Sequence, residues 1–72
     1  MITDEKAAIA LVAWRGLTRI SRRPEQDAVG LRILADLREW SDCYLSLEKV
    51  TQEQKRMFDQ ITEILAHLKV KR

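Results

Sequence analysis

The feature that most constrains this chain is an apolar stripe within residues 24–47. Six apolar residues recur there at intervals of three and four: Val29, Ile33, Leu37, Trp40, Tyr44 and Leu47. Because an α-helix turns by about 100° per residue, their side chains fall within roughly 80° of one another on one helix face. Such a face has to be buried, so the stripe predicts a helix that packs in a bundle or against a second chain.

Similar patterns predict a helix on each side of this one. Residues 4–21 follow Thr3, a typical N-cap residue, and are apolar over more than half of the helix circumference. The pair Arg23-Pro24 ends that helix, because the residue before a proline avoids the α region and proline suits the first turn of a new helix. Thr51 with Gln54 fits a capping box, which predicts a last helix over residues 51–70.

The boundary between the second and third helices leaves two architectures open. Residues 32–72 contain no glycine or proline, and the three–four spacing continues through Thr51 and Gln54 into the last segment. A single helix over residues 24–70 would be about 70 Å long and would need a coiled-coil partner. We expect an all-α antiparallel three-helix bundle, with a helical hairpin containing one long C-terminal helix as the alternative. The last helix adds Phe58, Ile61 and Leu65 to the predicted core or dimer interface.

Turn-forming residues are scarce, since Gly16, Gly30 and Pro24 are the only glycines and proline. An all-β chain of this length would need several such residues, so their scarcity favours helices. Gly30 falls inside the predicted middle helix, where it costs about 1 kcal/mol relative to alanine. Two interpretations stay open: the glycine permits a close approach of another helix, or the helix simply tolerates it.

The length of 72 residues predicts one helical domain over residues 1–72, and a domain this small is marginally stable alone. Small domains usually gain stability from disulfides, a metal or a second subunit. With one cysteine, Cys43, and one histidine, His67, neither an internal disulfide nor a structural zinc site is expected. Of these three sources of stability, association with a second subunit is the one left. The excess apolar surface of the first two helices predicts a homodimer.

A row of arginines is the most distinctive charged feature: Arg15, Arg19, Arg22 and Arg23. Bases at helical spacing can follow nucleic-acid phosphates, or they can anchor an acidic patch of a partner protein. They can equally form a solvated face that pairs with Asp36, Glu39 or Asp42 of the next helix. Trp14, at the edge of the first apolar face, is the predicted hydrophobic anchor at an interface.

No arrangement typical of catalysis or of a cofactor site is visible. Cys43 stands beside acidic Asp42 without a base to activate a thiolate, and a lone histidine is a poor metal site. We therefore expect neither enzymatic activity nor a cofactor or metal. The longest uncharged run, residues 7–14, is too short to span a bilayer, and no signal peptide is apparent, so a cytoplasmic location is expected.

These features predict a small interaction protein, an adaptor or inhibitor, that docks a helical face onto a target protein. In size and composition the chain resembles the short helical proteins with which phages and plasmids sequester host proteins, a class without a shared motif. One alternative is a DNA- or RNA-binding regulator that uses the arginine row and the basic tail, residues 69–72. Against it, the sequence shows no helix-turn-helix pattern and no aromatic residues among the bases. A second alternative is a helical subunit of a larger assembly.

Overall fold

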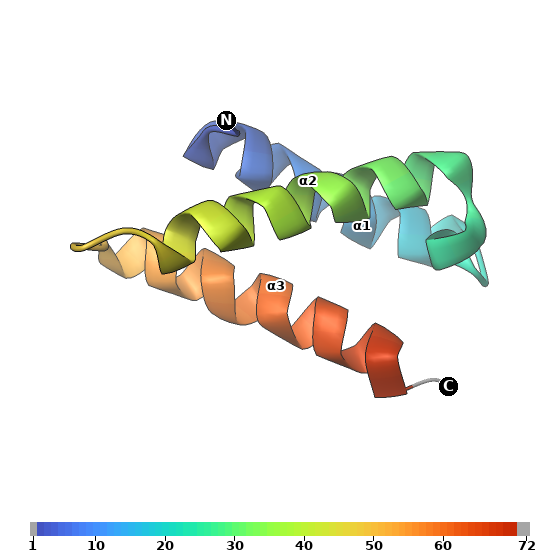
Figure 1. Ribbon diagram of the computed structural model, residues 1–72. Coiled ribbons are helices and arrows are strands. Elements are labelled where there is room, and N and C mark those ends of the chain that lie inside the picture. The colour runs from blue at the N-terminus through green and yellow to red at the C-terminus, as the bar shows by residue number, and fades with distance from the viewer. Residues whose placement is uncertain (1, 71–72) are drawn as a thin grey trace.

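Three helices form an antiparallel bundle in the computed structural model, which describes the backbone of residues 2–70 and the side chains of residues 2–68 (Figure 1). Helix α1 spans Asp4–Ile20, α2 spans Ala28–Leu45 and α3 spans Gln52–Val70. A 3₁₀ turn, η1, occupies Pro24–Gln26 between the first two helices. The predicted three-helix bundle is therefore confirmed, and the alternative with one long C-terminal helix is excluded.

The ends of the helices follow from local hydrogen bonds. Thr3 caps α1, because its side chain accepts from the backbone N–H of Lys6 at 3.1 Å. Helix α2 begins at Ala28 and not at Pro24 as the sequence suggested. Pro24 starts the separate turn η1, and the Pro24 carbonyl accepts a hydrogen bond from the N–H of Asp27 at 3.2 Å. Asp27 then acts as the N-cap of α2 and accepts from the N–H of Val29 at 2.9 Å.

The capping box explains why α2 and α3 are separate helices. Thr51 Oγ1 accepts from the N–H of Gln54 at 3.1 Å, and Gln54 Oε1 accepts from the N–H of Thr51 at 2.9 Å. Two donors that a new helix leaves without partners are thus satisfied reciprocally. At the end of α2, the N–H of Leu47 turns back to the carbonyl of Tyr44 at 3.0 Å, and the chain leaves the helix.

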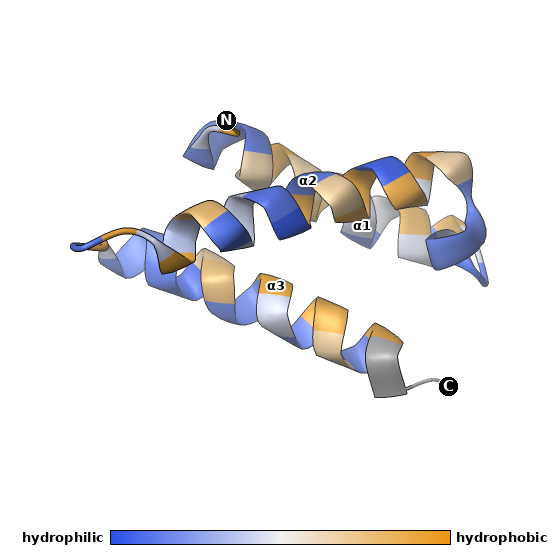
Figure 2. Cartoon of the chain, in the orientation of Figure 1, coloured by the Kyte–Doolittle hydropathy of each residue, from blue (hydrophilic) through white to orange (hydrophobic). Residues whose placement is uncertain are grey.

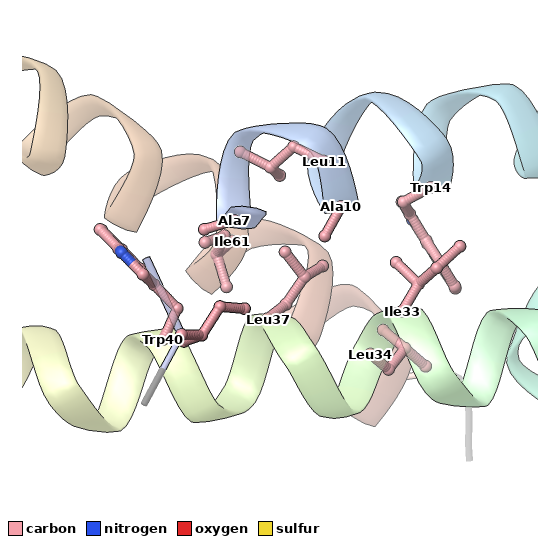
Figure 3. Close-up of a cluster of buried hydrophobic side chains, with 10 residues drawn as sticks. Ala7, Ala10, Leu11, Trp14, Ile33, Leu34, Leu37, Trp40 and Ile61 are labelled. Atoms are coloured by element: carbon pink, nitrogen blue, oxygen red, sulfur yellow. The ribbon is translucent and has the colours of Figure 1, made fainter. Parts of the chain in front are cut away.

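The core lies where the three helices meet, and Figure 3 shows its side chains. Helix α1 contributes two small residues, Ala7 and Ala10, together with Leu11 and Trp14, and α3 contributes Ile61. Leu37 and Ile61 are the largest side chains that are fully buried. The buried hydrophobic residues are Ile2, Ala7, Ala10, Leu11, Trp14, Ile33, Leu34, Leu37, Trp40 and Ile61.

The nine residues predicted for the core or a dimer interface fall into three groups by burial. Ile33, Leu37, Trp40 and Ile61 are buried, whereas Tyr44, Phe58 and Leu65 are half-buried between α2 and α3. Tyr44 stacks on both aromatic neighbours, with ring centroids 5.4 Å from Trp40 and 4.3 Å from Phe58. Val29 and Leu47 do not belong to the core, since they are 60% and 46% exposed. Leu47 lies two residues beyond the end of α2, so its side chain does not continue the apolar face of that helix.

The packing of Gly30, the residue after Val29, explains why Val29 is not buried. A Cβ at Gly30 would lie 1.8 Å from the carbonyl oxygen of Pro24 and 3.1 Å from Cδ2 of Leu17. The first turn of α2 therefore packs through its glycine against η1 and α1, and Val29 points away from this contact. Of the two interpretations of Gly30, close approach is correct, although the nearest neighbour is the turn η1 rather than another helix.

Asp4 connects all three helices at the other end of the bundle. Its carboxylate accepts from Nε1 of Trp40 in α2 and from Nε2 of Gln54 in α3, both at 2.9 Å. The hydrogen bond from Trp40 is the larger of the two influences that lower the pKa of Asp4, and that from Gln54 adds to it. Since the amide of Gln54 belongs to the capping box, this bridge joins the start of α1 to the start of α3.

Candidate protein-binding surfaces

A groove opens where α3 diverges from α1 towards the C-terminal half of α3 (Figure 1). We call it the α1–α3 groove. It has a volume of about 510 Å³ and lies between the C-terminal half of α1, the turn η1 and α3. Its lining residues are Trp14, Arg15, Thr18, Ser21, Arg22, Pro24, Glu25, Gln60, Glu63, Ile64, His67 and Leu68.

Apolar side chains from all three of these elements line the groove. Ile64 and Leu68 come from α3 and are half-buried, so part of their surface remains uncovered. Pro24 of η1 and Trp14 of α1 are buried. Figure 2 shows apolar residues recurring turn by turn along α3, and two of the apolar residues of α3, Ile64 and Leu68, line the groove.

Trp14 does not protrude from the surface as the sequence suggested, because it is only 6% exposed. Its indole belongs to the core and lies beside Ile33 of α2 (Figure 3). The physical reason is that Trp14 lies in the middle of the face that α1 buries, between the positions of Ala10 and Leu11, and not at its edge. Trp14 thus contributes to the wall of the groove rather than to a projecting anchor.

Only Arg15 and Arg19 of the arginine row belong to α1, because the helix ends at Ile20 and Arg22 and Arg23 lie in the loop before η1. Arg15 and Arg22 line the groove, whereas Arg19 and Arg23 do not. Arg15 donates a hydrogen bond to the side-chain oxygen of Gln60 in α3. Among the described side chains, the guanidinium groups of the other three make no hydrogen bond or ion pair. The expected pairing of the row with acids of the next helix is therefore not observed among the described side chains.

Acidic groups and a histidine complete the polar edge of the groove. Glu63 and His67 lie one turn apart on α3. One carboxylate oxygen of Glu25, in η1, is buried and has no hydrogen-bond partner. The α1 edge is thus basic, while the edges formed by η1 and α3 carry carboxylates. Sequence reasoning missed Glu25 and Ile64, although Ile61, Ile64, Leu65 and Leu68 continue the apolar periodicity of α3.

A second surface is the side of α1 that faces away from the bundle, which we call the α1 outer face. It consists of Ile9, Val12, Ala13, Gly16 and Ile20. Its three large side chains are well exposed, Ile9 to 63%, Val12 to 67% and Ile20 to 84%. The sequence predicts that a helix as apolar as this is buried on several sides, and within the described chain only one side is covered.

Other chemistry is sparse in the described part of the chain. No group of three or more His, Cys, Asp or Glu residues among the described residues is placed to hold a metal ion. None of the described helices is both long and apolar enough to cross a membrane. The predicted basic tail, residues 69–72, lies outside the described side chains. Comparison with known proteins finds no matching family model, no similar curated protein and no similar solved structure.

Proposed function

We propose that this chain is a small non-enzymatic interaction protein, an adaptor or inhibitor, that binds a segment of a target protein in the α1–α3 groove. The observation that carries the proposal is the half-covered apolar surface of Ile64 and Leu68 beside a basic edge. One inserted side chain of leucine or phenylalanine size would gain about 1.5–3 kcal/mol from burial. A few such contacts supply most of the affinity at a typical interface.

The charges at the groove favour a particular kind of target segment. Arginine matches the geometry of a carboxylate, so Arg15 and Arg22 suit an acidic residue on the α1 side. A basic residue of the target would meet Glu25 or Glu63 on the other side. We infer that the target presents apolar residues flanked by opposite charges, which would fix its orientation in the groove and speed its encounter.

A cross-linking experiment tests this proposal. A photoreactive amino acid at position 68 is expected to capture one discrete protein in producing cells, whereas the same group at Lys55, exposed on α3, is not. The captured protein is then purified, and its affinity is measured directly. Arg22→Glu should weaken binding about tenfold, or 1.4 kcal/mol, while Arg23→Glu is the matched control, since Arg23 does not line the groove. Equal effects of both changes would refute a role for the groove.

Nucleic-acid binding is the second candidate, because three guanidinium groups of the arginine row lack partners among the described side chains. It is tested by fluorescence anisotropy with a DNA duplex and a single-stranded RNA. If the candidate is correct, affinity falls steeply between about 50 mM and 200 mM salt, and the slope decreases when the arginines are changed. A helical subunit of a larger assembly is the third candidate, and failure to purify as a discrete folded species would support it.

We also propose that the protein is a cytoplasmic homodimer, as the sequence predicts. Single exposed apolar residues are ordinary on protein surfaces, but contiguous apolar patches mark sites of association. The α1 outer face provides such a patch on the side of α1 that the groove does not use.

A further inference from the structure

We propose that a second copy of this chain covers the α1 outer face, with the two α1 helices packed antiparallel about a two-fold axis near Val12 and Ala13. This inference rests on the proposed homodimer and names its interface. It does not depend on the target-binding groove, which lies on another side of α1.

The first step is the position of the apolar residues around α1. At about 100° per residue, the outer-face residues fall within a sector of roughly 100° that is centred opposite the buried Ala7 and Trp14. The only charged side chain of α1 in this sector is Glu5, in the first turn. Helix α1 thus has two apolar faces on opposite sides, and the chain itself covers one of them.

The second step is that the face fits a copy of itself. In an antiparallel pair centred between Val12 and Ala13, Ile9 of one copy lies opposite Gly16 of the other, and the reverse contact follows by symmetry. A Cβ built at Gly16 meets nothing within 4 Å, so there is open space over this glycine. Ile9 of each copy thus meets the small Gly16 of the other, and two helices with such a contact approach to about 8 Å.

The third step is the charge at the edge of the face. Glu5 and Arg19 lie on the same flank of α1, but 14 residues of helix separate them by about 21 Å, so they do not pair within one chain. A two-fold axis perpendicular to the helices brings this flank against the same flank of the partner. Glu5 of each copy then lies beside Arg19 of the other, which favours association. In a parallel pair this flank of one copy would lie on the opposite side of the interface from the same flank of the other, so Glu5 and Arg19 would not meet.

Sedimentation velocity over a wide range of protein concentration tests the interface. Helix α1 is only about 25 Å long, so we expect a reversible dimer rather than a permanent one. Val12→Glu should make the protein monomeric. Leu45→Glu is the matched control, because Leu45 is equally exposed, at 69%, but lies on α2. Circular dichroism verifies that both variants fold, which is expected since neither residue belongs to the core.

Charge exchange tests the antiparallel arrangement. Glu5→Arg and Arg19→Glu should each weaken the dimer about tenfold, since each change places like charges together twice. The double variant restores both pairs and should return to within about threefold of the original affinity.

Each contrary result overturns a defined part of the inference. A wild-type protein that stays monomeric at every concentration excludes the second copy. A dimer that survives Val12→Glu uses another surface, and a double variant weaker than both single variants excludes the antiparallel pair. In every case, cross-linking from position 68 still reports on target binding, so failure of the dimer and failure of the groove are distinguished.

Discussion

Removing the carboxylate of Asp4 should destabilise the whole bundle, because this group connects all three helices. The sharpest change is Asp4→Asn, which keeps the size of the side chain. Both partners of Asp4 present donors: the indole nitrogen of Trp40 can only donate, and Gln54 must use its amide nitrogen because its oxygen accepts from Thr51. The two donors reach different oxygens of Asp4, and asparagine replaces one of these oxygens with an NH2 donor, so it can satisfy one partner and not both.

The magnitude follows from these contacts. A hydrogen bond to a charged group contributes about 1.5–3 kcal/mol when buried, and Asp4 is exposed, so we take about 1 kcal/mol for the lost bond. Loss of an acid from the first turn of α1 adds about 0.5 kcal/mol through the helix dipole. Asp4→Asn should therefore cost about 1.5 kcal/mol. Asp4→Ala should cost about 2.5 kcal/mol, since it also leaves the indole N–H of Trp40, a residue only 2% exposed, without a partner.

Urea denaturation followed by circular dichroism measures both variants at a protein concentration at which the protein is monomeric, because dimerisation would otherwise alter the apparent stability. Glu5→Gln is the matched control: it removes a charge from the same first turn, and Glu5 makes no hydrogen bond or ion pair among the described residues. The control should cost only the dipole contribution of about 0.5 kcal/mol. Equal losses for Asp4→Asn and Glu5→Gln would refute the three-helix bridge.

The same carboxylate gives the bundle a dependence on pH. Because the pKa of Asp4 is lowered in the folded protein, chiefly by the hydrogen bond from Trp40, folding favours the ionised form. The contribution is complete above the ordinary pKa of 3.8 and is lost as the pH falls through the lower, folded value. The difference in stability between the wild type and Asp4→Asn should therefore shrink below about pH 4, and a constant difference would contradict this account.

Four further substitutions test the local packing in the same denaturation assay. Gly30→Ala should destabilise the protein despite a gain of about 1 kcal/mol in helix propensity, because its Cβ would overlap the Pro24 carbonyl. Gly16→Ala, measured where the protein is monomeric, should instead stabilise it by up to about 1 kcal/mol, since the added methyl meets nothing. Thr51→Ala should cost about 1 kcal/mol through loss of the capping box. Ser41→Ala should stabilise by about 0.5–1 kcal/mol, because the hydroxyl is buried without a partner.

The fold was predictable because each helix boundary is determined within a few residues of sequence. The Thr51–Gln54 capping box and the Thr3 N-cap both form the hydrogen bonds that their residue types predict. The start of α2 was misplaced, since Pro24 suits a 3₁₀ turn as well as an α-helix, and only Asp27 supplies a side chain that caps. Local sequence signals therefore located the helices well, except at the start of α2, where both Pro24 and Asp27 were possible starting points.

The candidate surfaces were harder to predict because they depend on how the helices cross. Periodicity identifies an apolar face but gives neither its partner nor the point at which two helices separate. Trp14 and Val29 show the consequence: periodicity alone did not reveal that Trp14 lies within the buried face of α1, or that packing through Gly30 leaves Val29 60% exposed. For the same reason, the divergence of α3 that uncovers Ile64 and Leu68 has no signal in the spacing of those residues.

The two surfaces of α1 suggest how so small a chain can be stable and still bind a partner. Burying all of its apolar residues internally would strengthen the bundle, yet Ile9, Val12 and Ile20 remain in solvent on a helix whose opposite face is fully packed. A second copy on the outer face would stabilise the fold by mass action, since it binds only the folded chain. The groove would then be free for a target, so a variant that cannot dimerise should bind the target with a similar intrinsic affinity but unfold at lower urea concentration. Target affinity that falls in parallel with dimerisation would show instead that the two surfaces are coupled.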